Sequence, residues 1–162
     1  MNCTFEQMSQ EHENTVMNIF NYYCENSFNA YPEGKIPNHF FSHFLDIAKT
    51  YPAFVVKVGN DIAGFCLLRP YNPFQTFKET AEASYFIKKE YTRKGIGSQI
   101  LIKLEETAKK MGIKKLLVDI SSENKQSIDF HLKNKFNICG TFKGIGKKLD
   151  KNFDVIWMQK DL

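Results

Sequence analysis

The sequence predicts an α/β (α+β) fold in which helices cover both faces of a mixed, mostly antiparallel, twisted sheet of about seven strands. Segments with strand-like and helical apolar spacing follow one another in the order β-α-α-β-β-β-α-β-α-β-β. A strand at Thr80–Lys88, a helix and a strand at Lys115–Ile120 imply parallel pairing at that step, whereas the early hairpin implies antiparallel pairing. The 162 residues contain no repeat or linker, so we expect a single domain over residues 1–162.

The first half of the chain is expected to hold three strands and two helices. Ser9 can cap the first helix, because acidic residues follow it and apolar residues then recur at helical spacing. Pro37 suits the start of the second helix, and Tyr51-Pro52 ends it. The expected order is a strand Thr4–Met8, a helix ending near Ser27, a loop Phe28–Lys35, the second helix, strands Ala53–Val58 and Ile62–Leu68 joined by a tight turn, and a loop Arg69–Phe74.

The second half alternates strands with helices and closes with a hairpin. Apolar residues from Ile100 to Ala108 form the stripe of a helix that ends near Met111, and Gly112 follows it as a C-cap. The continuous apolar middle of the next strand indicates burial on both faces. The expected order is strand Thr80–Lys88, that helix, strand Lys115–Ile120, a loop Ser121–Asn124, helix Lys125–Lys133, and strands Phe136–Lys147 and Phe153–Lys160.

The composition is that of an ordinary globular protein, with 43% apolar and 25% charged residues. A net charge of +4 fits an anionic ligand but is too diffuse to indicate nucleic acid. No apolar run approaches the roughly 18 residues that a membrane span needs, and the polar, acidic N-terminus is unlike a signal peptide. We therefore expect neither a nucleic-acid nor a membrane partner. Some of the 15 phenylalanine rings are expected to line a pocket or an interface in addition to the core.

The four cysteines are Cys3, Cys24, Cys66 and Cys139. None forms a C-x-x-C pair and no histidine stands at metal-ligand spacing from one, so no metal is expected. We expect buried or half-buried thiols in a reducing compartment, which indicates the cytoplasm. A catalytic cysteine is the alternative.

The segment Tyr91–Leu104, YTRKGIGSQILIKL, passes through a basic, glycine-rich turn into an amphipathic helix. A helix N-terminus presents unpaired N–H groups and the positive end of the helix dipole, and both favour an anion. Gly95 and Gly97 let the anion approach the backbone because they carry no Cβ, and Arg93 and Lys94 add positive charge. A diphosphate is the expected ligand; a plain strand-to-helix turn is the alternative for this segment alone. The spacing matches neither a P-loop nor a dinucleotide fingerprint.

This order of elements, with the basic turn, resembles the Gcn5-related N-acetyltransferase (GNAT) superfamily. There the pattern Arg/Gln-x-x-Gly-x-Gly/Ala follows the fourth strand and holds the pyrophosphate of acetyl-CoA. Here it stands as Thr92-Arg93-Lys94-Gly95-Ile96-Gly97, which keeps both glycines and departs from the pattern at Thr92. A second stretch, from Asn124 through Ser127 and His131 to Phe136, is similar to the family's N-x-x-A/S-x-x-F/L-Y/H-x-x-x-x-F.

The likeness extends over almost the whole chain to the phosphinothricin N-acetyltransferase branch. It is carried by YYCENS, ETAEASYFI, GIGSQIL and the closing GTFKGIGKKLDKNFDVIWMQKDL, whereas NAYPEGKIPNHF departs from that branch. The resemblance implies transfer of acetyl from acetyl-CoA to the primary amine of a small amino-acid-like acceptor, of the phosphinothricin or methionine sulfoximine type, by direct attack. It also implies a homodimer. A peptide or ribosomal-protein N-terminal acetyltransferase and a non-catalytic acetyl-CoA-binding module are the alternatives.

The resemblance assigns the catalytic roles to Glu82 and His131. Glu82 would be the base, since a carboxylate inside a buried strand needs a reason and burial raises its pKa; an edge-strand glutamate facing solvent is the alternative. His131 would protonate or position the leaving thiolate, with a packed helix histidine as the alternative. Backbone N–H groups near Phe86 and Ile87 would stabilise the oxyanion.

The resemblance also implies the residues that bind each substrate. Asn124 could equally be a helix cap. Arg69 could bind an acceptor carboxylate in a bidentate pair, or be an unpartnered surface arginine. Acetyl-CoA is expected on Tyr85, Phe86, Ile87, Arg93, Lys94, Gly95, Ile96, Gly97, Ser98, Asn124 and Ser127, and the acceptor on Glu25, Asn26, Ser27, Arg69 and Tyr71.

Overall fold

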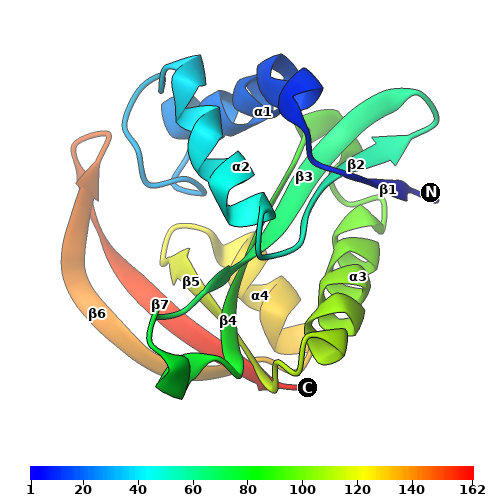
Figure 1. Ribbon diagram of the computed structural model, residues 1–162. Helices are drawn as coiled ribbons and strands as arrows, with labels where there is room; N and C mark the ends of the chain where they lie inside the picture. The colour runs from blue at the N-terminus through cyan, green and yellow to red at the C-terminus, as the bar shows by residue number, and fades with distance from the viewer.

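The computed structural model describes residues 1–162, and its strands form one continuous sheet flanked by helices (Figure 1). The strands are β1 (Thr4–Gln7), β2 (Ala53–Val58), β3 (Asp61–Pro70), β4 (Thr80–Ile87), β5 (Lys115–Ser121), β6 (Asn137–Lys148) and β7 (Lys151–Asp161). The helices are α1 (Glu13–Asn26), α2 (Phe41–Ala48), α3 (Ile96–Lys110) and α4 (Lys125–Lys133). The strand order is β1-β2-β3-β4-β5-β7-β6, and β4 with β5 is the one parallel pair. The predicted mixed, mostly antiparallel sheet is therefore confirmed.

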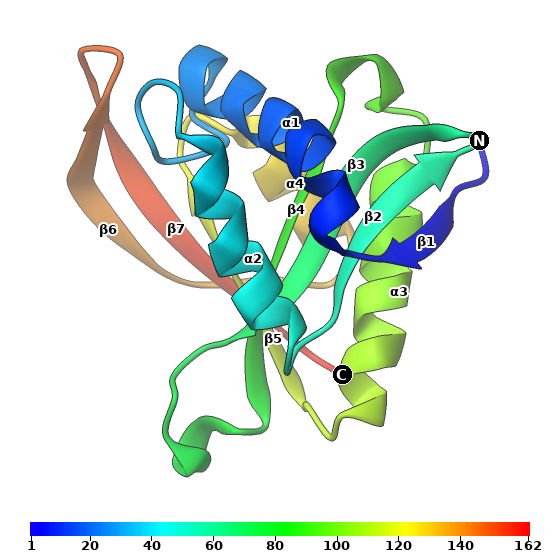
Figure 2. The same cartoon turned by 45° about the horizontal axis from the view of Figure 1, so that its top comes forward.

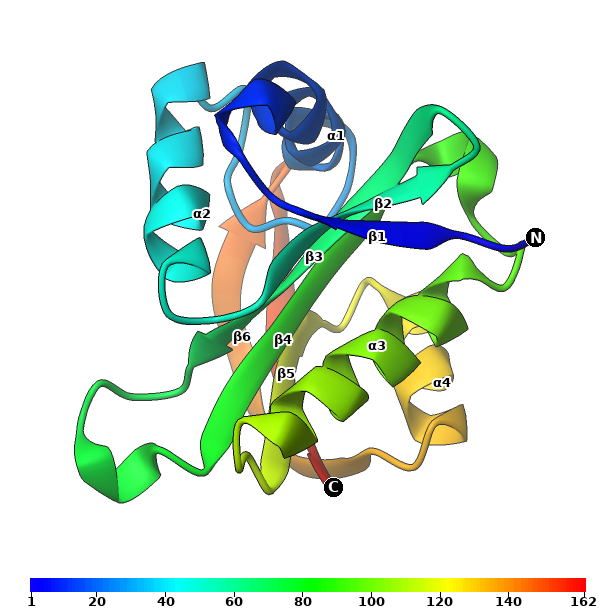
Figure 3. The same ribbon diagram turned by 45° about the vertical axis from the view of Figure 1, so that its right-hand side comes forward.

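Helices α1 and α2 cover one face of the sheet, and α3 and α4 cover the other (Figure 3). The buried apolar side chains accordingly form two clusters. Along β3, Phe65 and Leu67 belong to the cluster under α1 and α2, whereas Cys66 and Leu68 belong to the cluster under α3, as the pleat of a strand requires. None of the helices is both long and apolar enough to cross a membrane.

The predicted burial or half-burial of the cysteines holds for three of the four residues. Cys24 and Cys66 are buried and Cys3 is half-buried, but Cys139 is exposed because it lies on the edge strand β6. All four are free thiols.

The pairing between β4 and β5 is short, and this leaves a gap in the middle of the sheet. The strands pair at only three positions, from Thr80 with Lys115 to Glu82 with Leu117. Beyond Glu82 both strands continue, β4 to Ile87 and β5 to Ser121, without pairing to each other. The gap opens at the ends of the strands that lie next to the first turns of α3 and α4.

Strand β3 is longer than the sequence pattern indicates. Arg69 and Pro70, predicted to begin a loop, instead continue the antiparallel ladder opposite Glu82 and Ala81. Proline is tolerated at the last position of the strand because the pairing ends there. This extension brings Arg69 into contact with Glu82.

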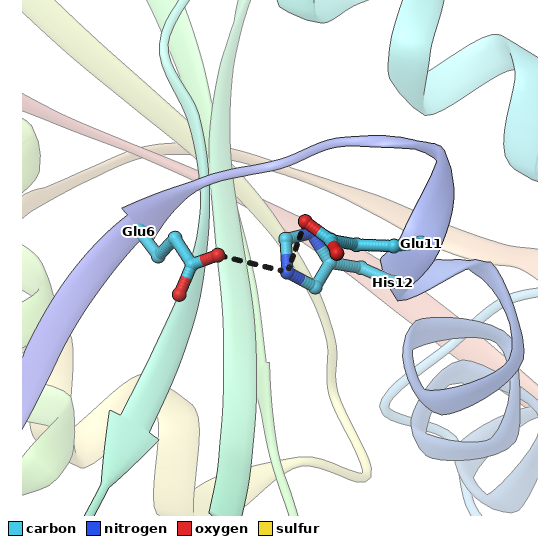
Figure 4. A group of neighbouring side chains, drawn as sticks. All are labelled: Glu6, Glu11 and His12. Atoms are coloured by element: carbon cyan, nitrogen blue, oxygen red, sulfur yellow. Dashed lines mark ion pairs between the residues drawn. The ribbon is translucent and has the colours of Figure 1, made fainter. Parts of the chain in front are cut away.

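The start of α1 differs slightly from the prediction, because a 3-10 turn, Gln10–His12, separates Ser9 from the helix. The backbone N–H of Ser9 donates to Nδ1 of His12 at 3.0 Å, so the ring proton is on Nε2, which lies 3.3 Å from Glu6 (Figure 4). Glu6, Glu11 and His12 have the side chains of a metal site, but Glu6 also pairs with Lys57 at 2.9 Å. These contacts give the three residues a structural role, which is to hold β1 against the start of α1.

The β6–β7 hairpin is tied to the loop that follows α1, and Figures 1 and 2 show its tip beside that loop. Lys148 is only 1% exposed, and its Nζ donates to the carbonyls of Ala30 at 2.6 Å and Tyr23 at 3.4 Å. Burial lowers the pKa of this ammonium. The ring of Tyr31 also stacks on Phe153 of β7, with centroids 6.0 Å apart. The hairpin and the loop therefore form one wall.

Gly64 is a position where the fold excludes a side chain. A Cβ there would lie 2.5 Å from the carbonyl oxygen of Phe86, whereas one at Gly140 would meet nothing within 4 Å. We expect Gly64→Ala to lower the free energy of unfolding by about 1–3 kcal/mol through overpacking, measured by urea denaturation. Gly140→Ala is the matched control and should change stability little. Equal losses for the two variants would contradict the close packing of β3 on β4.

Candidate active site

An open cleft of about 1370 Å³ runs along the gap between β4 and β5. One end is lined by the turn before α3 and by the first turn of α4. The other end lies on the opposite face of the sheet, under α1, α2 and the loop between them. Most of the predicted cofactor residues and three of the five predicted acceptor residues, Asn26, Ser27 and Arg69, therefore border one continuous space.

The turn before α3 has the geometry that an anion site requires. Arg93 (φ 59°) and Gly95 (φ 81°) are both left-handed, and the helix begins at Ile96. The first intrahelical bond is donated by Gln99, so the amides of Ile96, Gly97 and Ser98 are unpaired in the protein. Glycine adopts the left-handed conformation of residue 95 without strain, whereas the same conformation at Arg93 is uncommon for a residue with a side chain.

The predicted residues of this turn do not all face the cleft. Arg93, Gly95, Gly97 and Ser98 line it, together with Thr92. The ammonium of Lys94 lies over the ring of Tyr91, 5.6 Å from its centroid, and the side chain of Ile96 is buried in the core. These two residues offer only backbone groups to a bound anion.

The β4 side of the gap presents alternate backbone amides. Lys88 donates its N–H to Ala63 on β3 at 2.7 Å, and ladder bonds alternate along an antiparallel pair, so Phe86 also faces β3. The N–H groups of Tyr85 and Ile87 therefore point into the gap. The predicted oxyanion donors are thus corrected: Ile87 stays a candidate, Tyr85 joins it, and the amide of Phe86 is used by the sheet.

Glu82 is buried in the middle of the sheet, 8% exposed, which excludes the solvent-facing edge position. Nε and Nη2 of Arg69 lie 2.7 and 2.6 Å from one carboxylate oxygen, Oε2. The other oxygen, Oε1, makes no hydrogen bond within the protein. Burial raises the pKa of the Glu82 carboxyl, and the Arg69 guanidinium opposes the rise. Glu82 itself does not line the cleft, but its ion-pair partner Arg69 and its neighbour in the strand, Ala83, do.

Asp119 is a member of this cluster that the sequence analysis missed. It lies on β5 with one carboxylate oxygen 3.8 Å from Nη2 of Arg69, and it lines the cleft. Burial, and then the Asp119 carboxylate, raise the pKa of the neighbouring Tyr31 hydroxyl. Two carboxylates facing one guanidinium leave a net negative charge when both are ionised, which suits a cationic amine. The signal in the sequence was an acid within the buried strand KLLVDIS, the same argument that identified Glu82.

His131 is 2% exposed, and both of its ring nitrogens have partners. Nδ1 lies 2.7 Å from the carbonyl oxygen of Ser127, so it carries the ring proton, and Nε2 accepts from the hydroxyl of Tyr85 at 2.8 Å. Burial lowers the pKa of His131. The contacts of His131 are therefore those of a packed helix histidine, although the residue also lines the cleft. As arranged, the imidazole is neutral and holds the Tyr85 hydroxyl.

The remaining predicted residues fall into two groups. Asn124 caps α4 by accepting the Ser127 N–H at 3.1 Å, and both residues line the cleft, so its two predicted roles are compatible. Asn26 and Ser27 line the acceptor end, where their side chains donate to carbonyls of the last turn of α1. Glu25 is exposed and Tyr71 packs its ring on Phe77 and Trp157, and neither lines the cleft.

A sheet that separates at a central parallel pair, next to a helix N-terminus with free amides, defines the class of acetyltransferases that the sequence resembles. Residues 16–136 match the acetyltransferase (GNAT) family, and the chain belongs to that family.

Individual relatives agree with this assignment. The chain is 30% identical over 113 residues to an L-methionine sulfoximine/L-methionine sulfone acetyltransferase of Pseudomonas aeruginosa, which covers 69% of this chain and 66% of that relative's length. The fold of this chain is similar to that of a phosphinothricin acetyltransferase from Sinorhizobium meliloti in complex with AcCoA. The TM-score is 0.93, the identity is 21%, and the match covers 100% of this chain and 89% of the other. It is also similar to a ribosomal-protein-alanine N-acetyltransferase from Brucella melitensis, with a TM-score of 0.90, 25% identity and coverage of 98% and 99%.

The buried His131 makes stability depend on pH. Its pKa is lowered in the folded chain and close to 6.5 in the unfolded chain, so its contribution is complete above about pH 6.5 and is lost as the pH falls through the lowered value. We expect the wild type to lose more unfolding free energy between about pH 7.5 and 5.5 than His131→Gln, measured by urea denaturation. His39→Gln, at an exposed position, should keep the wild-type pH dependence. The same pH dependence in His131→Gln would contradict a neutral, buried imidazole.

Proposed function

We propose that the chain is, as one catalytic domain, an acetyl-CoA-dependent N-acetyltransferase that acetylates the primary amine of a small amino-acid-like acceptor. The observation that carries the proposal is the single cleft, which joins the free amides at the start of α3 to Asp119 and to Arg69, the ion-pair partner of Glu82. The relatives named for methionine sulfoximine, methionine sulfone and phosphinothricin support a small amino-acid-like acceptor.

The coenzyme fits one half of the cleft. The diphosphate would lie against the amides of Ile96, Gly97 and Ser98, with Arg93 adding positive charge. The pantetheine arm would follow the amides of Tyr85 and Ile87 in the gap, and Asn124 and Ser127 would border it from the other side. No step of the proposal uses a metal.

Glu82 is the proposed general base. The negative cluster attracts the acceptor as an ammonium ion, and Oε1 of Glu82 removes a proton from it, directly or through one water. The free amine then attacks the thioester carbonyl carbon and forms the C–N bond. The C–S bond breaks, and the leaving thiolate takes up the surplus proton of the nitrogen, which gives the acetylated amine and the free thiol of CoA. The amides of Tyr85 and Ile87 stabilise the oxyanion. His131 acts through Tyr85, whose hydroxyl it positions at the wall of the gap.

Two other functions remain distinguishable by experiment. The likeness to a ribosomal-protein-alanine N-acetyltransferase favours a peptide N-terminus as the acceptor. A panel of free amines against alanine- and serine-initiated peptides separates this alternative, since peptides should then be acetylated faster. A non-catalytic acetyl-CoA-binding module would bind the coenzyme but release no thiol with any amine.

We also propose that the protein is a cytoplasmic homodimer that acts without nucleic acid or membrane. The four free thiols fit a reducing compartment. For the dimer, β6 is the edge strand of the sheet, and it exposes Ile138, Phe142 and Ile145. A long edge strand with exposed apolar side chains is suited to pairing with a second chain.

Replacing the proposed base should abolish most of the activity. We expect Glu82→Gln to lower the rate of thiol release from acetyl-CoA by roughly 10²–10⁴-fold, because Gln keeps the shape but accepts no proton. The wild-type rate should also rise with pH through the raised pKa of Glu82, and the variant should lack this limb. Glu79→Gln, which breaks a half-exposed ion pair with Lys114, is the matched control and should keep its activity. Equal rates for wild type and Glu82→Gln over about pH 6–9 would remove Glu82 from the mechanism.

A charge on the edge strand should prevent dimer formation. We expect the wild type to sediment as a dimer and Phe142→Lys, which places an ammonium on the exposed edge, to sediment as a monomer. Phe74→Lys is the control, because Phe74 is also exposed but lies in the loop after β3. A wild-type monomer at micromolar concentration would overturn the proposed dimer.

A further inference from the structure

We infer that the acceptor carries an aromatic or long aliphatic side chain, which is held in an aromatic pocket formed by Phe20, Phe40, Phe44, Ile47 and Phe86. This inference rests on the proposed acetyltransferase function and specifies its substrate. The pocket belongs to the acceptor half of the cleft, and all five side chains line that space.

The aromatic pocket is built from rings that hold one another in place. Phe20 of α1 lies at its centre, stacked on Phe40 with centroids 5.9 Å apart. It also meets Phe44 and Phe86 edge-on, at 5.6 and 5.3 Å. Phe40 and Phe44 contact each other edge-on at 5.6 Å. Rings packed in this way keep their orientation, so the pocket is formed before a ligand enters.

The aromatic pocket keeps an open side toward the cleft. Phe40, Phe44, Ile47 and Phe86 are half-buried, whereas Phe65 beneath them is fully buried and forms the floor. Apolar surface that stays partly accessible inside a cleft gains free energy when a ligand covers it. Ser42 and Asp46 are exposed on the outer face of α2, whereas the exposed ring of His43 packs against Phe40 at the rim of the pocket, with centroids 4.8 Å apart.

The sheet connects this pocket to the proposed base. On the face under α1 and α2, β3 and β4 present three successive cross-strand pairs: Arg69 with Glu82, Leu67 with Ser84, and Phe65 with Phe86. Pairs on the same face are about 6.6 Å apart along a strand. The floor therefore changes from charged to apolar within one such step of Glu82, and it is aromatic after two. An amine placed at Glu82 would direct its side chain over Leu67 and toward the rings beneath α2.

The charged groups of the acceptor half lie at the opposite end, whereas Asn26, Ser27 and Tyr31 line its side formed by α1 and the loop that follows. Arg69, Glu82 and Asp119 form the charged cluster, and Ser84 supplies the one hydroxyl on the intervening floor. A sulfone or phosphinate at the end of the acceptor side chain would lose hydrogen bonds to water in the aromatic pocket, and the five side chains that form the pocket carry no donor to replace them. A thioether or a phenyl ring loses no strong hydrogen bonds to water and makes favourable contacts with the rings of the pocket.

The test compares acceptors that differ only at the side-chain tip. Thiol release from acetyl-CoA is measured with L-methionine and L-methionine sulfone, which differ by two oxygen atoms, and with L-phenylalanine and phosphinothricin. We expect kcat/KM for methionine and phenylalanine to exceed that for the sulfone and phosphinothricin at least tenfold. A preference for the sulfone or phosphinothricin overturns the inference and leaves the acetyltransferase proposal standing. Thiol release with no amine, from a folded protein that binds acetyl-CoA, overturns both.

A variant of the aromatic pocket gives a second readout. Phe44→Ser should raise KM at least tenfold for methionine and phenylalanine, and it should lower kcat/KM for methionine sulfone less than for these two acceptors. Phe44→Leu keeps the packing of α2, and it should penalise phenylalanine more than methionine because it removes only the ring contact. Phe74→Ser, outside the cleft, should change no acceptor constant. Equal effects of Phe44→Leu on all four acceptors would overturn the assignment of this pocket.

Discussion

The site depends on the point where two parallel strands stop pairing. β4 and β5 share hydrogen bonds only as far as Glu82 and Leu117, so the backbone groups that follow must be satisfied by something other than a neighbouring strand. On one wall these are the amides of Tyr85 and Ile87. Because α3 begins beside the same gap, its unpaired amides face the same space. Incomplete pairing in the sheet and incomplete pairing at a helix terminus thus create one binding groove with polar walls.

The two faces of the sheet carry different tasks. The face under α3 and α4 holds the anion turn, the capped start of α4 and the Tyr85–His131 pair. The face under α1 and α2 holds the charged cluster and the aromatic pocket. Glu82 belongs to the second face but lies at the last paired position before the gap, so it is within reach of both. The buried carboxylate is tolerated because Arg69, in the neighbouring strand, neutralises part of its charge.

Local patterns predicted most of the fold, because strand alternation, helical spacing and turn residues are written in short segments. The anion turn was predictable for the same reason: Arg93 to Ser98 are consecutive. Glu82 was found because a carboxylate in an apolar strand is unusual. The partnership of Arg69 with Glu82 and Asp119 was not predicted, since it depends on the register between three strands, which no local pattern specifies. The end of β3 was predicted too early because Pro70 is typical of a loop. The prediction of Phe86 as an oxyanion donor was wrong because the partner strand determines which way a backbone amide points.

The buried Lys148 links the hairpin at one edge of the sheet to the loop after α1, which borders the end of the cleft under α1 and α2. The loop after α1 makes no such bond with the anion turn, which is held by β4 and α3 instead. A lineage could therefore change the length or twist of the β6–β7 hairpin and so reshape the end of the cleft under α1 and α2. The end of the cleft at the anion turn would keep its geometry. Substrate range and coenzyme use would then evolve along separate parts of the chain, joined only at the buried carboxylate between them.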